Sequence, residues 1–375
     1  MQYSYLLLSL FVISAGSLLA QCPSGNVNLS TQAEVDAYIA TYPNCTEVNG
    51  SLLIGPPFGS SDITDLTGLE GLSTVSGTLR IQLNDSLVSL IGLDNLTSIG
   101  GFLLIDRNDA LATLTGLESL TTVDGNLDIG GNRSLESLMG LENLASVGGY
   151  LSITGNNTLP SLTGLSGLSS VGGFLAINVN DNLLSLTGLS ALTTVGGYVA
   201  IWSNGSLASL TGLESLTTIG GYLGLVGNSN LTNLASLENL DASAITDLSI
   251  QNSPQLSNCA VTSICDYLGI AMSIATISGN ATGCASREEV EMACVVSTVD
   301  MLPTDIELFP NPTSGRLQWR NVVAERVEVF TAQGQRVMDD TNPGQELDLS
   351  GLTAGVYVLH LVAADGVHAS RVVKK

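Results

Sequence analysis

Residues 189–210 read Leu-Ser-Ala-Leu-Thr-Thr-Val-Gly-Gly-Tyr-Val-Ala-Ile-Trp-Ser-Asn-Gly-Ser-Leu-Ala-Ser-Leu, with no charged residue among them. The apolar residues fall into three short groups: Leu192 with Val195, Val199 with Ile201, and Leu207 with Leu210. The middle group alternates with period two, which predicts a half-buried strand. The Gly-Gly pair and the asparagine supply corners where other residues would be strained. The stretch therefore predicts one turn of short strands and tight corners.

This pattern returns with a fixed period of 24 residues, from Leu66 to about Leu240. A Gly-Leu pair marks the period at Gly68, Gly92, Gly116, Gly140, Gly164, Gly188 and Gly212. A short fixed period without helical spacing is the signature of a solenoid. One coil cannot bury its apolar face alone, but coils stacked about 4.8 Å apart create one continuous Leu/Ile/Val core. We therefore predict a mainly all-β protein built on a parallel β-solenoid with 24-residue coils.

An asparagine occupies the same turn of every coil. It recurs every 24 residues, at Asn84, Asn108, Asn132, Asn156, Asn180, Asn204 and Asn228. Such a side chain can point inward, satisfy backbone groups that the strands leave unpaired, and bond to its copy in the next coil. A row of ligand-binding amides is the functional alternative. We predict a structural asparagine ladder.

Both ends of the solenoid depart from the period, as capping requires. An early coil carries an insertion at residues 55–60, and the last coil slips by about one residue near Ile250. All six cysteines lie outside the coils, at Cys22, Cys45, Cys259, Cys265, Cys284 and Cys294. We predict a Cys22–Cys45 disulfide and two bridges in the second cluster, for which three pairings are possible. A metal site is disfavoured because neither cluster contains a histidine or a Cys-x-x-Cys motif.

The domain boundaries follow from composition. Residues 1–20 read as a signal peptide, with an apolar run from Tyr5 to Ile13 and a cut after Ala20. No later stretch reaches the ~18 apolar residues of a membrane span. A short helix is expected at Gln32–Tyr42. We expect an N-terminal disulfide cap at 21–50, the solenoid at 51–257, a cysteine cap with a small helical part at 258–295, a linker at 296–305 and a further domain at 306–375.

The chain is strongly acidic, with 11 Lys and Arg against 34 Asp and Glu and a net charge of −23. Residues 1–300 carry −21 of this, from 25 acids and 4 arginines. Such a surface repels phosphate backbones and anionic membranes, which argues against nucleic acid as a partner. Both histidines, His360 and His368, lie in the last domain, so nucleophilic triads and His-based zinc sites are excluded from the coils. We expect no enzyme activity and no cofactor.

The repeat resembles the receptor L-domain, the right-handed β-helix relative of leucine-rich repeats. The resemblance is carried by Leu-x-Ile-x-x-Asn-x-x-Leu runs such as residues 79–87. The leading segment from Cys22 to Cys45 is similar to the N-terminal cap of secreted bacterial members. The resemblance covers residues 22–295 and implies a right-handed solenoid. For function it is a weak guide, because solenoids bind many kinds of ligand.

Residues 306–375 have a different composition and alternate like the short strands of a β-sandwich. Their motifs are Leu308-Phe-Pro310-Asn311-Pro312-Thr-Ser-Gly315, then Thr331-Ala-Gln-Gly334, then Leu347-Asp-Leu-Ser-Gly-Leu-Thr-Ala-Gly355-Val-Tyr357, and finally Lys374-Lys375. These motifs resemble the type A C-terminal sorting domain of the type IX secretion system of Bacteroidota. The resemblance implies that the type IX machinery carries the protein from the periplasm to the cell exterior. An ordinary immunoglobulin-like module is the alternative.

An acidic row on the coils is one candidate site. Its members, Glu70, Asp94, Glu118, Glu142, Glu214 and Glu238, share one coil position, which Ser166 and Ser190 interrupt. Stacked carboxylates can hold a hard cation such as Ca²⁺ or support glycosidase chemistry. Because they lie at a polar corner, a solvated edge is the default interpretation, and we predict no metal site. Asp106 and Asp109, beside Arg107, are a second candidate for a cation.

An aromatic column is the other candidate. Phe102, Tyr150, Phe174, Tyr198 and Tyr222 share one coil position, with Thr78 and Asn126 in the other coils and Trp202 at the edge. Since Leu175 and Ile177 point inward, the column should lie on an outer sheet face. We expect the adjacent small residues, Ser152, Ala176, Ala200 and Gly224, to leave the rings accessible. Ring–ring packing that only stiffens the solenoid, or packing under a loop or under the domain at 306–375, is the alternative.

These observations lead to a hypothesis about function. Exposed rings suit glycan stacking or protein contacts. We predict a secreted or cell-surface recognition module that binds a glycan or a protein through a solenoid face. Two alternatives are a polysaccharide-active β-helix enzyme and a purely structural envelope protein.

Overall fold

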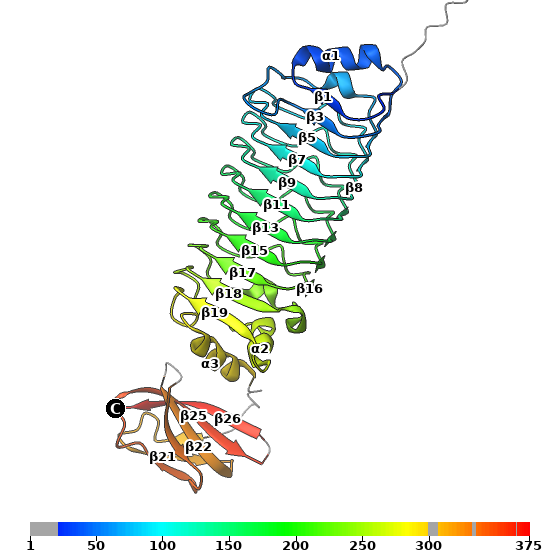
Figure 1. The fold of residues 1–375 in the computed structure, drawn as a ribbon. Coiled ribbons are helices and arrows are strands. Elements are labelled where there is room, and N and C mark those ends of the chain that lie inside the picture. The colour runs from blue at the N-terminus through cyan, green and yellow to red at the C-terminus, as the bar shows by residue number, and fades with distance from the viewer. Residues whose placement is uncertain (1–21, 299–306, 332–334, 365) are drawn as a thin grey trace, which may run out of the picture.

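The computed structural model describes residues 22–298, 307–331, 335–364 and 366–375. Two β bodies follow one another along the chain: a long parallel solenoid and a smaller antiparallel domain (Figure 1). The mainly β solenoid that the period predicts is therefore confirmed. The predicted signal peptide at 1–20, the linker from residue 299 onward and Gly334 lie outside the described residues.

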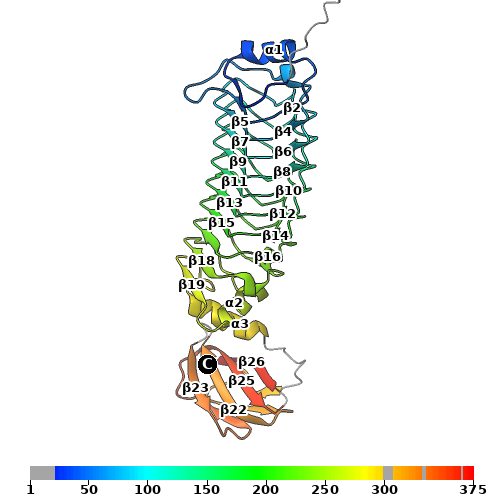
Figure 2. The same ribbon diagram turned by 45° about the vertical axis from the view of Figure 1, so that its right-hand side comes forward.

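Each regular coil contributes one four-residue strand and one two-residue strand, which stack into two parallel sheets (Figure 2). The eleven-stranded sheet consists of β1 (Val27–Leu29), β3 (Leu52–Ile54), β5 (Leu79–Gln82), β7 (Leu103–Asp106), β9 (Leu127–Gly130), β11 (Leu151–Thr154), β13 (Leu175–Asn178), β15 (Val199–Trp202), β17 (Leu223–Val226), β18 (Asp247–Gln251) and β19 (Ile274–Ser278). The eight-stranded sheet consists of β2 (Glu47–Val48), β4 (Thr74–Val75), β6 (Ser98–Ile99), β8 (Thr122–Val123), β10 (Ser146–Val147), β12 (Ser170–Val171), β14 (Thr194–Val195) and β16 (Thr218–Ile219).

The register places equivalent residues directly beside one another. Ile153 pairs with Ile177, 24 residues on, and Ile177 pairs with Ile201. Both expected irregularities are present, because Ile54 pairs with Ile81 and Leu225 pairs with Ile250. At the inward positions, aliphatic residues therefore stack on aliphatic residues from coil to coil.

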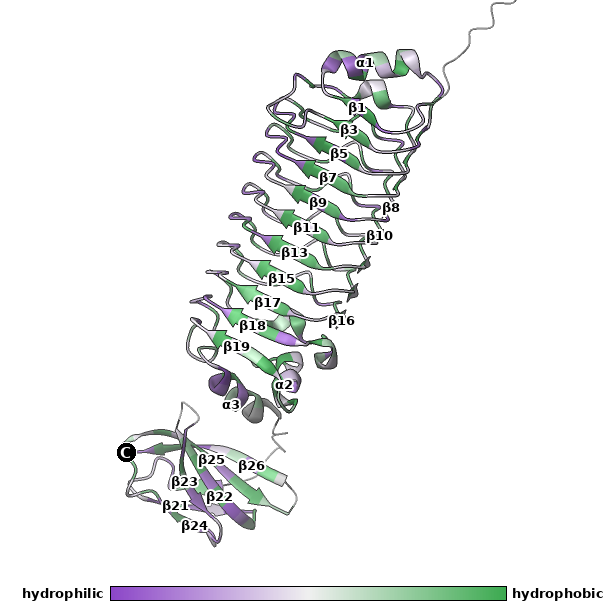
Figure 3. Cartoon of the chain, in the orientation of Figure 1, coloured by the Kyte–Doolittle hydropathy of each residue, from purple (hydrophilic) through white to green (hydrophobic). Residues whose placement is uncertain are grey.

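The stacked interior is a column of aliphatic side chains. Leu, Ile and Val at the inward positions of every coil are almost completely buried in one continuous cluster. Figure 3 shows the apolar residues concentrated on the strands of the long sheet and the polar residues at the turns. Burying a Leu or Ile side chain stabilises a fold by about 1.5–3 kcal/mol, so the stacking of coils is the main stabilising term.

The seven asparagines form a buried ladder at one corner of this core. All are 0% exposed, and each Nδ2 donates to the carbonyl of an isoleucine, as Asn156 does to Ile129 at 2.9 Å. Each Oδ1 from Asn108 onward accepts the backbone N–H of the preceding asparagine, for example 3.1 Å from Asn132 N to Asn156 Oδ1. Ser253 and Asn280 continue the ladder into the C-terminal cap. The amide thus replaces the strand partners that the corner removes.

Glycine is required at the corner that each repeated Gly-Leu pair marks. Gly188 has φ 119°, and a Cβ placed there would lie 2.0 Å from the carbonyl oxygen of Leu162 in the preceding coil. Gly92, Gly116, Gly140, Gly164 and Gly212 show the same geometry. The coils can therefore approach one another closely only because this position lacks a side chain.

A helix and a disulfide close the N-terminal end of the core. Helix α1 (Gln32–Thr41) begins with a capping box between Thr31 and Glu34 and buries Val35 and Tyr38 against the first coil. It packs on the short 3₁₀ turn η1 (Thr67–Leu69). The predicted Cys22–Cys45 disulfide is present.

Two helices close the other end. After the 3₁₀ turns η2 (Ala235–Leu237) and η3 (Ala242–Ala244) come α2 (Thr262–Gly269) and α3 (Arg287–Thr298). The cysteines pair as Cys259–Cys284 and Cys265–Cys294, which selects one of the three possible arrangements. Helix α3 runs three residues past 295, where we placed the end of the cap.

The C-terminal domain consists of two antiparallel sheets around their own core. One sheet contains β20 (Glu307–Phe309), β21 (Arg316–Arg320) and β24 (Glu346–Asp348), and the other contains β22 (Ala324–Thr331), β23 (Arg336–Asp340), β25 (Gly355–Ala363) and β26 (Gly366–Lys374). Leu317, Trp319 and Leu361 are among the residues that fill the space between the sheets. The predicted β-sandwich is therefore confirmed.

Candidate functional site

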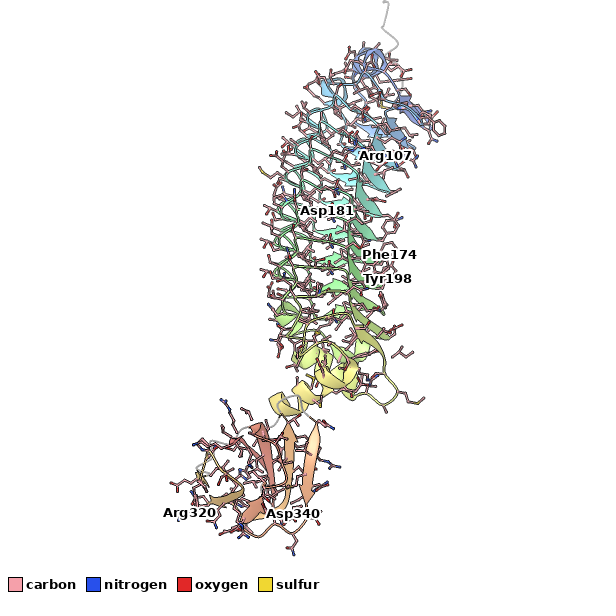
Figure 4. The ribbon with its side chains drawn as sticks, turned by 90° about the vertical axis from the view of Figure 1, so that its left-hand side faces the viewer. Arg107, Phe174, Asp181, Tyr198, Arg320 and Asp340 are labelled. Carbon is pink, nitrogen blue, oxygen red and sulfur yellow. A yellow bond between two sulfur atoms is a disulfide. The ribbon has the colours of Figure 1, made fainter. Side chains whose placement is uncertain are left out.

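The outer face of the long sheet carries the aromatic column. Within each four-residue strand, the first and third residues point into the core, as Leu175 and Ile177 do at 0% exposure. The ring immediately before each strand lies on the opposite face, and Figure 4 shows Phe174 and Tyr198 one above the other at this margin of the solenoid. Period-two alternation of the strands is the physical reason for this placement.

Three of the rings form a face-to-face stack. The centroids of Tyr150 and Phe174 are 4.5 Å apart with an interplanar angle of 7°. Those of Phe174 and Tyr198 are also 4.5 Å apart, at 6°. Parallel rings this close must overlap face on face, and the distance matches the spacing of adjacent strands. The stack therefore follows directly from the 24-residue register.

Phe102 contacts the N-terminal end of the stack edge to face and is not stacked on it. Asn126 occupies the intervening coil, and the rings of Phe102 and Tyr150 meet edge to face at 6.1 Å. The Oδ1 of Asn126 accepts the backbone N–H of Tyr150 at 3.0 Å, so the asparagine anchors the first ring of the stack. The column has no ring at Thr78.

The column breaks at Tyr222. Its ring does not continue the stack but lies over Gly224, where an added Cβ would come within 2.4 Å of the Tyr222 hydroxyl. The ring also meets Trp202 at 6.5 Å and 74°, an edge-to-face contact. Because Ala176 and Ala200 occupy the equivalent position in the two preceding coils, only Gly224 leaves room for a ring to lie this way.

The exposed part of the column is at this break. Tyr198 is 38% exposed and Trp202 is 40% exposed, while Phe102, Tyr150, Phe174 and Tyr222 are only partly exposed. We expected the small residues beside the rings to keep all of them accessible. The small residues are instead largely buried themselves, and Ala200 is only 1% exposed.

Two carboxylates share the outer face with the rings, on the N-terminal side. Burial raises the pKa of Asp128 above its usual value, the nearby Asp106 raises it further, and a hydrogen bond from Ser152 opposes both effects. Burial also raises the pKa of Asp106, against the attraction of Arg107. Sequence reasoning missed Asp128, although the alternation that places Ala176 on the outer face also places Asp128 there.

We expect Asp128→Asn to stabilise the protein at neutral pH. A carboxyl whose pKa is raised on folding favours the folded state below its unfolded pKa of about 3.9, and this contribution is lost as the pH rises through the folded pKa. Asparagine removes the cost of the ionised group without changing its size. The melting temperature should rise by about 1–2 °C at pH 7 and stay unchanged at pH 3. Equal shifts at both pH values would contradict the electrostatic explanation.

The acidic row caps the glycine corners. A carboxylate oxygen of Asp94 accepts the backbone N–H of Gly92 at 2.7 Å, and the same contact joins Glu118, Glu142 and Glu214 to the glycine two residues before each. At Glu214 these hydrogen bonds, with one from Ser236, outweigh burial and lower the pKa. Glu238 accepts hydrogen bonds from Thr262, at the start of α2.

The geometry gives these acids a structural role. Asp106 lies 3.8 Å from Arg107, whereas Asp109 pairs with Arg133 at 3.3 Å, so the second candidate pair is divided between two arginines. Within the described residues, no group of three or more His, Cys, Asp or Glu side chains could hold a metal ion.

The residues of the C-terminal motif come together at strand β26. Asn311, between Pro310 and Pro312, donates through Nδ2 to the carbonyl of Arg371 at 2.7 Å and accepts the backbone N–H of Val373 at 2.9 Å. Lys374 pairs with Gly355 across β25 and β26.

Two further motif residues brace the neighbouring turns. Tyr357 donates its hydroxyl to the carbonyl of Thr353 at 2.8 Å, and the carbonyl of Gly315 accepts the N–H of Leu349 at 2.7 Å. Together with Asn311, they tie the last strand to the motif that begins the domain.

Each of the two β bodies contains a region that matches a known protein family. Residues 307–375 match the family described as the secretion system C-terminal sorting domain. The tail is a type IX sorting domain. Residues 44–116 match the family described as the Receptor L domain, and the coils that follow continue its register through β17. No curated protein matches the chain.

The sorting domain places the protein outside the cell. It indicates export to the cell surface or secretion through the type IX system, and the three disulfides suit an oxidising compartment. Among the described residues, no helix is long and apolar enough to cross a bilayer. Both matched families are of non-catalytic kinds.

Proposed function

We propose that this protein is a recognition module of the cell exterior that binds a glycan or a protein through the outer face of its eleven-stranded sheet. The single observation that carries the proposal is the aromatic group at the end of the ring stack, where Tyr198 and Trp202 are exposed and Tyr222 is partly exposed. Large exposed rings on an exported protein are typical of contact surfaces, because they supply apolar area with few rotatable bonds.

The chemistry of the coils supports binding over catalysis. Residues 22–286 contain three basic side chains, Arg80, Arg107 and Arg133, and neither lysine nor histidine. The two outer-face carboxylates, Asp106 and Asp128, have no histidine or lysine on the coils as an acid–base partner. The protein is therefore not proposed as an enzyme.

The test removes the three rings of this group. We expect Tyr198→Ala, Trp202→Ala and Tyr222→Ala, combined in one protein, to abolish retention on a glycan array and on a panel of immobilised extracellular proteins. These rings lie outside the core, so the variant should keep its β-sheet circular dichroism. The matched control is Phe58→Ala, which removes a ring that is 89% exposed in the insertion at the other end.

Three outcomes would count against the proposal. Unchanged retention of the triple variant would exclude this face as the binding site. Absence of any retention by the wild-type protein would favour a structural envelope role instead, and release of sugar from the array would favour an enzyme.

A further inference from the structure

The break in the ring column creates a surface that the rest of the column lacks. In the stack, Phe174 has one face against Tyr150 and the other against Tyr198. Stacked rings present their edges outward, and ring edges carry the positive part of the aromatic quadrupole. Tyr198 is the last member of the stack, so its second face is free of a ring partner in the next coil. At this end of the stack, the negative face of an aromatic ring is therefore available to a ligand.

Trp202 and Tyr222 complete this surface. Trp202 is the last residue of β15 and lies on the same outer face. The ring of Tyr222 lies over Gly224 of the adjacent strand β17 and meets the ring of Trp202 edge to face. The Gly-Gly corner before Tyr222 also differs from the others. Gly220 donates its N–H to Gly197, whereas Gly196 donates to Val171, and Gly221 has φ 151°. Backbone and side chain thus both change at the coil where the stack stops.

The charge around the break is negative. In the next coil, Asp247 of β18 holds the position equivalent to Tyr222. The nearest arginine on a strand of this sheet is Arg80, five strands from β15 and about 24 Å distant. Arg287 of the C-terminal cap is held by Glu291 and by Ser273, next to β19. Arg107 and Arg133 are already paired with Asp106 and Asp109. With −21 of net charge on residues 1–300, the solenoid attracts cations and repels anionic glycans.

We propose that the Tyr198–Trp202–Tyr222 break is the specificity-determining subsite of this face and that it takes an arginine or lysine side chain from a basic peptide segment of a partner protein. Aromatic faces attract cations within about 6 Å of the ring centroid, most strongly with tryptophan. A neutral glycan is the competing ligand, but it needs several ring faces spread as a platform, and the stack hides those faces. This inference rests on the proposed function, because it names the ligand of the same surface.

The experiment uses the full chain and two matched probes. One is a blocked peptide of alternating arginine and glycine, and the other is the same peptide with glutamine in place of arginine. Binding is followed by calorimetry and by the fluorescence of Trp202, against the background of the buried Trp319. We expect the arginine peptide to bind at least tenfold more tightly than the glutamine peptide. The affinity for the arginine peptide should fall as the salt concentration rises.

The decisive variant keeps every ring. Gly224→Ala recreates the alanine of the two preceding coils, and its Cβ displaces the Tyr222 ring towards the stack. We expect at least tenfold weaker binding of the arginine peptide. Gly205→Ala is the control, because nothing lies within 4 Å of its added Cβ, and it should bind like the wild type. If Gly224→Ala fails to fold, Trp202→Leu tests the same surface with similar apolar bulk.

The outcomes separate the two proposals. Equal binding of both peptides, or wild-type binding by Gly224→Ala, overturns the cation subsite. Retention of neutral oligosaccharides that depends on the three rings also overturns it but leaves the proposed recognition function intact. If neither peptides, oligosaccharides nor extracellular proteins bind, the proposed function fails as well.

Discussion

Asn156→Ala is expected to destabilise the solenoid by about 3–6 kcal/mol, although it removes only one small polar side chain. The substitution removes the hydrogen bonds that Asn156 makes to the buried carbonyl of Ile129 and to the buried backbone N–H of Asn132. It also removes one of two bonds of the Asn132 Nδ2, which keeps its bond to the carbonyl of Ile105. Each buried group left unsatisfied costs about 1–3 kcal/mol. Denaturant unfolding and hydrogen exchange at the coils on either side measure the effect.

The neighbouring residue supplies the control. Asn157 is exposed, so Asn157→Ala should change stability by no more than about 0.5 kcal/mol. A loss below about 1 kcal/mol for Asn156→Ala would mean that water or a shifted backbone satisfies the orphaned groups. The ladder would then be a consequence of the fold and not one of its causes.

Gly188→Ala is expected to cost about 3 kcal/mol or more. Alanine is strained at φ 119°, and its Cβ would lie 2.0 Å from the oxygen and 2.3 Å from the carbon of the Leu162 carbonyl. Because the obstacle is backbone, it cannot rotate away. The two coils must separate locally, which weakens the 2.9 Å hydrogen bond from Leu162 N to the carbonyl of Thr187. Differential scanning calorimetry should show a lower melting temperature.

Gly205→Ala is the matched substitution for this test too. Gly205 sits in the turn after Asn204, and its added Cβ meets open space. Alanine there should be neutral or slightly stabilising, because it lowers the entropy of the unfolded chain. Equal melting temperatures for the two alanine variants would show that adjacent coils can slide apart without cost.

The two expected effects concern the contacts that set the spacing and the register between coils. Leucine packing supplies most of the stabilisation, but leucines alone do not determine the distance or the register between coils. The glycine corner allows close approach, and the asparagine corner couples each coil to the next through directional bonds. A chain with the same leucines and other corners would bury a similar area without a unique stacking.

The aromatic column shows how one repeated position can serve two roles. Within the stack, the rings of Tyr150 and Phe174 cover each other face to face. At the end of the stack, the same kind of side chain becomes an exposed surface, because Gly224 lets Tyr222 turn aside. The contact surface that we propose is confined to the last members of the column.

The architecture follows from the repeat period alone. A strict spacing of 24 residues requires equivalent side chains to stack, so the parallel sheets, the buried leucines and the placement of Phe174 opposite Leu175 all follow from period and alternation. The motifs around Asn311 likewise identified the sorting domain before its two sheets were known.

Three features depend on contacts within the folded chain: the pairing of the last four cysteines, the contact between Asp128 and its neighbours, and the break in the ring column. Periodicity specifies which residues share a column, but not how each side chain rotates within it. The direction of the Tyr222 ring depends on the missing methyl of Gly224 and on Trp202 in the neighbouring strand, contacts between coils that exist only once the chain has stacked on itself.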